Sequence, residues 1–235
     1  MEGLSGDIFA TKGIEYLIVI GYLVVLIVFW RMLSQPRAGE RSPLGERALR
    51  SGLGLFAVRD GVYYHQGHSW AAPEGRNVFR VGMDEFAMRL LGRPGAVELP
   101  AVGTKLSQGE RGWSLAVGSK TIPVLSPVNG EIIAVNTDVR QAPDLLSNDP
   151  YEGGWLMKVK VNSGAAAHRN LLSGKLARAW MDSTLEKLRL TQAGELGFVM
   201  PDGGIPVDGF ARALGGEDWD AVAREFLLVD DDERA

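Results

Sequence analysis

The first candidate for chemistry is a lysine next to a predicted tight turn. Residues 116–136 read AVGSKTIPVLSPVNGEIIAVN, and the apolar runs on either side of Gly118 and Ser119 are typical of a β-hairpin. Lys120 is the lysine of this stretch. A lysine amine displayed on a β-turn is how carrier domains present a covalently attached cofactor, so group carriage on Lys120 is the first chemistry to consider.

Histidines are the other side chains whose spacing suggests a site. His65 and His68 lie three residues apart in a stretch expected to be a strand, where positions three apart point to opposite faces of the sheet. His168 stands alone in the sequence. We therefore interpret His65 and His68 as surface or packing residues and expect no metal site.

Composition excludes several classes of function. The chain has 235 residues, a formal net charge of −4 and no cysteine. The charge lacks the basic character of nucleic-acid-binding proteins, so no nucleic acid is expected as a partner. The absence of cysteine excludes disulfides, thiolate metal sites and cysteine nucleophiles. No glycine-rich phosphate loop, nucleophile elbow or convincing carboxylate pair appears, so no catalytic residue is expected and the protein is predicted not to be an enzyme.

The N-terminal region contains an apolar run that predicts a transmembrane helix over 14–33. No charged residue occurs over 16–30, and the extended apolar span reaches the roughly 20 residues that a bilayer core requires. Tyr16 and Trp30 stand where interfacial aromatic residues belong. Gly21 would allow close approach of another helix. With Arg31, which ends the charge-free run, these residues are the interface candidates.

The charges beside this helix predict its orientation. Residues 31–50 hold five arginines, whereas residues 1–13 hold one lysine. The positive-inside rule therefore predicts a single-pass protein of the inner (cytoplasmic) membrane with its C-terminal domain in the cytoplasm. The predicted segments are a short non-cytoplasmic N-terminus (1–13), the transmembrane helix (14–33), a linker (34–51), the main domain (52–190) and a C-terminal extension with a short helix and an acidic tail (191–235).

The main domain is predicted to be mostly β-structure. Short apolar runs between turn residues predict strands over 53–58, 62–70, 77–83 and 153–162. The stretch 83–92 interrupts them and predicts a helix that Asp84 caps and Gly92 ends.

Helical periodicity returns near the end of the main domain. One helix is predicted to bury a face made of Ala177, Met181, Leu185 and Leu188. A shorter amphipathic helix in the extension is predicted to bury Trp219, Val222, Ala223 and Phe226.

Four motifs then occur in order at nearly constant spacing. They are YHQGHSW (64–70), VGMDEFAMRLLGRPGAVELPAVGTKLSQGE (81–110), SPVNGEIIAVN (126–136) and NDPYEGGWLMKVK (148–160). Together they resemble the glycine cleavage system H protein over roughly residues 60–190. The resemblance implies a lipoyl/biotinyl-type barrel-sandwich hybrid, two antiparallel sheets packed face to face, with flanking helices. It also implies a group carrier rather than a catalyst, with lipoate as the carried cofactor.

The resemblance also allows us to ask whether Lys120 stands at the family's lipoate attachment position. The family attaches lipoate to the lysine of an E-S-x-K-A turn. Counting eight residues back from Pro127, or nineteen forward from Pro100, places that lysine at Ser119. Ala116 stands where the family has glutamate. Using Lys120 would need a one-residue shift, which sends strand side chains to the opposite face unless the turn alone absorbs it.

These observations predict an H-protein-like adaptor rather than a carrier. We expect a non-catalytic, membrane-anchored accessory subunit without cofactor, whose partners are the lipid bilayer and other subunits of a membrane protein complex of energy-transducing or redox type. The alternative is a membrane-tethered lipoyl carrier of a glycine-cleavage-like system, with lipoate on Lys120. For a third possibility, a small-ligand binding module, the sequence shows no pocket signature.

Overall fold

The computed structural model describes residues 19–26, 56–191 and 207–230. Residues 19–26 are helical and exposed, and Gly21 lies among them. Within these described residues, no helix combines the length and the apolar character needed to cross a bilayer. The other interface candidates (Tyr16, Trp30 and Arg31) and the predicted linker lie outside the described residues, so the predicted span over 14–33 stays a prediction.

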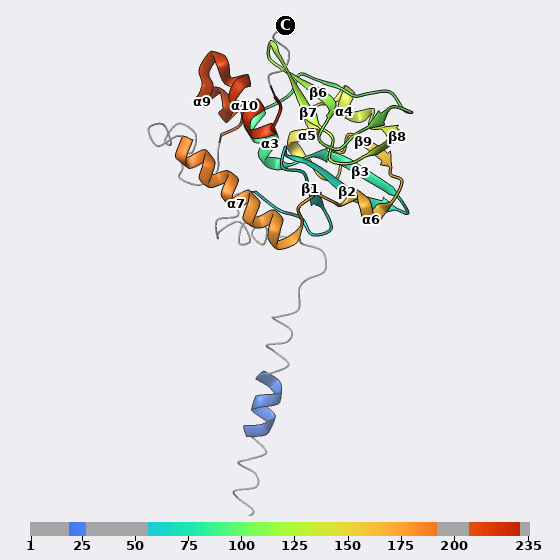
Figure 1. The fold of residues 1–235 in the computed structure, drawn as a ribbon. Helices are drawn as coiled ribbons and strands as arrows, with labels where there is room; N and C mark the ends of the chain where they lie inside the picture. Colours follow the sequence, from blue (N-terminus) through green and yellow to red (C-terminus); the bar gives the residue numbers. More distant parts are fainter. Residues whose placement is uncertain (1–18, 27–55, 192–206, 231–235) are drawn as a thin grey trace, which may run out of the picture. The chain divides into compact units, whose positions relative to one another are not determined.

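The larger sheet has six strands in the order β1-β2-β3-β9-β8-β5, and neighbouring strands are antiparallel (Figure 1). Its strands are β1 (Tyr63–Tyr64), β2 (Ser69–Gly75), β3 (Val78–Met83), β5 (Lys105–Leu106), β8 (Gly130–Val135) and β9 (Met157–Lys160). β9, the strand that comes last in the chain, lies in the middle of the sheet between β3 and β8.

The smaller sheet has three antiparallel strands in the order β4-β6-β7. Its strands are β4 (Ala96–Glu98), β6 (Arg111–Val117) and β7 (Lys120–Leu125). Buried side chains from both sheets form one core, to which Phe79 and Val159 contribute from the larger sheet and Leu115 and Ile122 from the smaller. The predicted mostly-β fold of two antiparallel sheets with flanking helices is therefore confirmed.

Helix α3 (Glu85–Leu91) begins and ends where the sequence predicts. The Asp84 side chain accepts a hydrogen bond from the backbone N–H of Ala87, which satisfies one donor of the first turn. Gly92 ends the helix with φ 79, a left-handed conformation that glycine adopts without strain.

Two predicted strands differ from the structure. The stretch 62–70 is interrupted by a turn at residues 65–68, in which His68 has φ 63, so Tyr64 pairs back with Trp70. Gly67 lets Leu227 approach this turn closely, because a Cβ on Gly67 would lie 2.6 Å from the carbonyl oxygen of Leu227. Of the predicted strand over 53–58, residues 56–58 are described and form no strand.

The long helix α7 (Gly174–Thr191) buries the predicted face. Its four predicted core residues, Ala177, Met181, Leu185 and Leu188, are all buried. Three one-turn helices lie in the connections before and after β9: α4 (Asp138–Gln141), α5 (Leu145–Asn148) and α6 (Gly164–Ala167).

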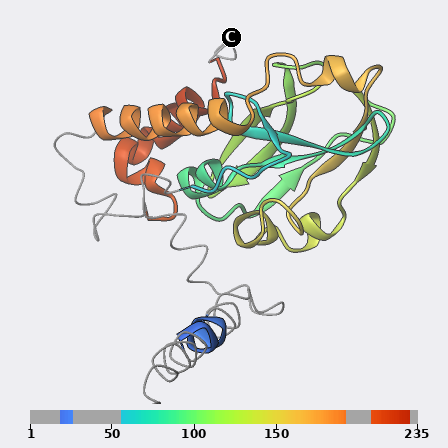
Figure 2. The same ribbon diagram turned by 90° about the horizontal axis from the view of Figure 1, so that it is seen from below.

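The C-terminal extension folds back onto the main domain. Residues 207–230, called here the C-terminal cap, contain α9 (Phe210–Gly215), the 3-10 helix η1 (Gly216–Asp218) and α10 (Trp219–Leu227). The cap contacts α3 and β7, and both views show it on the same side of the strands as α7 (Figures 1 and 2). The predicted face of α10 is confirmed in large part: Trp219, Ala223 and Phe226 are buried and Val222 is half-buried.

Candidate functional site

The hairpin between β6 and β7 contains the turn that the sequence predicts. Val117 and Lys120 are directly paired, so Gly118 and Ser119 are the two turn residues. Gly118 has φ 62, as the first central residue of a type II′ hairpin turn requires. Glycine adopts this conformation without strain, so the turn forms without any contribution from a lysine.

The residues singled out by the family count occupy distinct places in this hairpin. Ser119, which the count predicts to be at the family's lysine position, is exposed at the tip. Ala116, which the count predicts to be at the position of the family's glutamate, lies on β6, half-buried and paired with Thr121. The tip therefore displays a serine hydroxyl group.

Lys120 is the first residue of β7, and its amine already has partners in the cap. Its Nζ donates hydrogen bonds to the carbonyl oxygen of Glu217 at 2.8 Å and to the carboxylate of Asp220. The side chain is 31% exposed. The hydrogen bond from Lys120 is the main reason why the pKa of Asp220 is lowered from its ordinary value.

The cap also approaches the turn through Arg212. The Arg212 guanidinium lies over the Trp219 ring, 4.7 Å from the centroid, which is a cation–π contact. A Cβ built on Gly118 would lie 3.6 Å from Arg212 Nη2. The cap therefore contacts the first residue of β7 and lies close to the turn.

His68 is a packing residue, as predicted, although it lies in a turn rather than in a strand. It is buried, and its Nδ1 lies 2.7 Å from Oδ2 of Asp84, the residue that caps α3. Its ring stacks on Phe86 at 4.4 Å and packs on Trp180 at 4.7 Å. The pair thus joins the 65–68 turn to the start of α3 and to α7.

The other two histidines also have structural surroundings. His65 Nδ1 accepts a hydrogen bond from the N–H of Gly67 at 3.1 Å, and burial is the main cause that lowers the pKa of His65, followed by the charge of His68. His168 stacks on Tyr63 at 4.4 Å. Among the described residues, no group of three or more histidine, aspartate or glutamate side chains is arranged to hold a metal ion.

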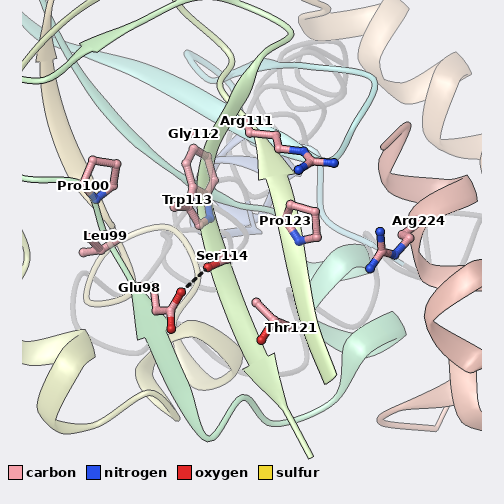
Figure 3. Close-up of a pocket in the computed structure, with 10 residues that line it drawn as sticks. All are labelled: Glu98, Leu99, Pro100, Arg111, Gly112, Trp113, Ser114, Thr121, Pro123 and Arg224. Carbon is pink, nitrogen blue, oxygen red and sulfur yellow. Dashed lines mark hydrogen bonds between the residues drawn. The ribbon is translucent and has the colours of Figure 1, made fainter. Parts of the chain in front are cut away.

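An open pocket of about 520 Å³ lies over the outer face of the smaller sheet (Figure 3). Its lining includes Glu98, Arg111, Ser114, Thr121, Pro123 and Arg224. Ser114 Oγ donates a hydrogen bond to Glu98 at 2.8 Å, as the dashed line shows. Arg224 enters from α10, so the pocket depends on how the cap packs, and the sequence alone gives no signal for it.

Comparison with known proteins places the chain in a family. The family model described as "Glycine cleavage H-protein" matches residues 62–184, which is more than half of the chain. The chain belongs to the glycine cleavage H-protein family. This H-protein-like domain is therefore a member of a family of lipoyl carriers rather than catalysts.

Individual H proteins are similar over much of their length. The glycine cleavage system H protein of Alteromonas mediterranea is 40% identical over 102 residues, 43% of this chain and 79% of that protein. The H protein of Idiomarina loihiensis is 36% identical over 122 residues, 51% of this chain and 92% of that protein. A crystal structure of an H protein from Mycobacterium marinum has 28% identity and a TM-score of 0.46, and the match covers 54% of this chain and 98% of that chain. The residues of the C-terminal cap lie beyond the part that the H-protein family model matches.

Proposed function

We propose that this protein is a non-catalytic, membrane-anchored H-protein-like adaptor that carries no lipoate and assembles with other subunits of a membrane protein complex, energy-transducing or redox in type. The observation that carries the proposal is the hairpin turn, whose exposed tip holds Ser119, the residue that the motif count assigns to the family's lysine position. A serine hydroxyl cannot form the amide through which the family holds lipoate. The contacts of the Lys120 amine with Glu217 and Asp220 support the same conclusion.

The membrane part of the proposal is supported by the sequence. The apolar run over 14–33 and the arginines after it favour a single span of the inner membrane with the H-protein-like domain in the cytoplasm. A carrier that must visit several soluble partners gains nothing evident from such an anchor, whereas a subunit of a membrane complex does.

A mass measurement on the intact protein tests whether the chain carries lipoate. The native chain is expressed in a lipoate-replete host that lipoylates its own proteins, beside K120R and the double variant A116E/S119K, which restores the glutamate and the lysine of the family turn. We expect the native chain and K120R to have the unmodified mass and the double variant to gain one lipoyl group. A lipoyl increment on the native chain that K120R abolishes would reject the proposal.

The alternative function is a membrane-tethered lipoyl carrier that uses Lys120. It predicts the opposite result, a lipoyl group on the native chain that K120R abolishes. The observation that favours it is the pairing of Lys120 with Val117, which makes Lys120 the residue next to the tip. A shift confined to the two turn residues would bring its amine to the display position.

The adaptor role has a separate test. An affinity tag on the native chain, followed by purification from native membranes in mild detergent, is expected to yield other membrane subunits in fixed stoichiometry. Repeated recovery of the protein alone would rule out the adaptor function.

A further inference from the structure

The C-terminal cap is attached to the domain in two ways, and the first is apolar. Phe210 and Phe226 pack on Phe86 of α3, with ring centroids 5.6 and 5.5 Å apart. The N–H of Gly209 donates to the carbonyl oxygen of Arg89 at 2.7 Å. This attachment fixes the cap on α3, and the three aromatic rings are all buried.

The second attachment is polar, and part of it lies at the hairpin turn, where Lys120 Nζ contacts the carboxylate of Asp220 and the carbonyl oxygen of Glu217. Away from the turn, Arg89 pairs with Asp208 at 3.0 Å and Lys187 with Glu225 at 2.7 Å. The side chains of Lys120 and Asp220 are partly open to solvent, with 31% and 24% exposed. Exposed ion pairs contribute little, so the aromatic contacts with α3 decide whether the cap stays closed.

The cap is also separate from the family's common part. The family model ends at residue 184, within α7, and the cap follows through residues 192–206. Its contacts with α3 and β7 are therefore an addition to the H-protein-like domain at the surface beside its display turn.

We propose that the C-terminal cap is an intramolecular cover that controls access to the hairpin turn. When it is closed, the amine of Lys120 is engaged, and α3 and the start of β7 are covered. A modifying enzyme or partner protein that reads the turn must also contact the strands and helix beside it, so it competes with the cap. The inference goes beyond the proposed function, because it concerns access to the turn and holds whichever residue stands at the tip.

The chemical step that reports on the cover is acylation of a lysine amine. The nitrogen lone pair attacks the carbonyl carbon of an activated ester, an amide bond forms, the alcohol-type leaving group departs and the amine loses a proton to solvent. An amine that donates to both Asp220 and Glu217 must first break these contacts. The rate of acylation at Lys120 therefore measures how often the cover releases it.

The experiment uses the full chain in mild detergent and a small N-hydroxysuccinimide acetate probe at neutral pH. Peptide mass spectrometry follows the rate at Lys120 relative to the exposed Lys175 of α7 in the same molecule. D220N removes the charge that holds the amine, and F226A removes an aromatic contact with α3. E217Q is the matched control, because it changes a neighbouring carboxylate and keeps the backbone carbonyl that Lys120 contacts.

We expect Lys120 to react more slowly than Lys175 in the native chain. D220N should raise its rate about 2- to 5-fold, as the loss of one exposed ion pair implies. F226A should raise it at least about tenfold, because removing a buried aromatic ring weakens the whole attachment. E217Q should leave it unchanged. Equal rates at Lys120 in F226A and the native chain would overturn the proposal.

Two further measurements keep this result interpretable. In F226A, hydrogen exchange should become faster over α9 and α10 and stay slow over β3 and β9. If β3 and β9 also lost their protection, the cap would not be a cover that opens separately from the domain. A purified lipoate ligase should modify the lysine introduced by S119K, in the A116E/S119K turn, at least about tenfold faster when F226A is also present, and equal rates would overturn the proposal. Failure of the proposed function would give a different result: the native chain would already carry lipoate as purified, before the probe or the ligase is added.

Discussion

The buried pair of His68 and Asp84 gives the sharpest test of how the domain is held together. One carboxylate oxygen of Asp84 accepts from the N–H of Ala87 at 2.8 Å, and the other lies 2.7 Å from His68 Nδ1. The side chains of Asp84 and His68 are 0% and 1% exposed. Replacing Asp84 with alanine therefore removes both contacts at a place that water does not reach.

The expected loss of stability follows from these two contacts. Loss of an N-cap side chain costs about 1 kcal/mol, and leaving a buried polar atom without its partner costs about 1–3 kcal/mol. D84A should thus lower the free energy of unfolding by about 2–4 kcal/mol. For a protein of this size each kcal/mol corresponds to about 2–4 °C, so the melting temperature should fall by roughly 4–16 °C.

Urea unfolding of the full chain in mild detergent, followed by circular dichroism, measures the change. D84N is the matched control, because its amide oxygen still accepts from Ala87 and its NH₂ group donates to a neutral His68 ring. We expect D84N to lose less than about 1.5 kcal/mol. The reasoning is refuted if D84A lies within about 0.5 kcal/mol of the native chain or if D84N is as unstable as D84A.

Three further predictions concern packing and pH. G82A should cost about 1–3 kcal/mol in urea unfolding, because its Cβ would lie 2.4 Å from the buried Trp70 ring, whereas G75A, at a site with open space, should change little. Burial is the main cause that raises the pKa of Tyr64 to about 12. Because this pKa is higher in the folded state, about 3 kcal/mol of stability that is present below pH 10 should be lost as the pH rises toward 12. In urea titrations, the stability of Y64F should therefore fall less steeply with alkaline pH than that of the native chain. The pKa of Asp220 is lowered mainly by Lys120, with a smaller contribution from Arg224. The stabilising effect of the Asp220 carboxylate is therefore present above pH 3.8 and lost as the pH falls through the lowered pKa. At a pH below that pKa, D220N and the native chain should show the same hydrogen exchange in α10.

Local patterns in the sequence were sufficient for several elements. Asp84 and Gly92 bound α3 because a capping carboxylate and a left-handed glycine act on their own neighbours. The buried face of α7 follows from its periodicity in the same way. The turn at Gly118 and Ser119 was also predictable, since glycine at the first turn position satisfies a local requirement.

Other features depend on contacts between distant parts of the chain. Lys120 and Asp220 are 100 residues apart, and no periodicity links them. The turn at residues 65–68 was missed because the strand prediction was carried through polar and turn-forming residues (His65, Gln66, Gly67 and His68) between two aromatic runs. What holds that turn is the buried contact of His68 with Asp84, sixteen residues later. The pocket on the smaller sheet likewise includes Arg224 only because the cap packs against β7.

The central place of β9 has a consequence for synthesis of the chain on the ribosome. β3 and β8 each have one free side until β9 pairs with both of them, and β9 begins only at Met157. A nascent chain that stops before this strand presents two unpaired strand edges, which are sites of aggregation. The hairpin of β6 and β7 is local and can form early, whereas the larger sheet closes in one late step. Truncation before residue 157 should thus be more harmful than removal of the cap.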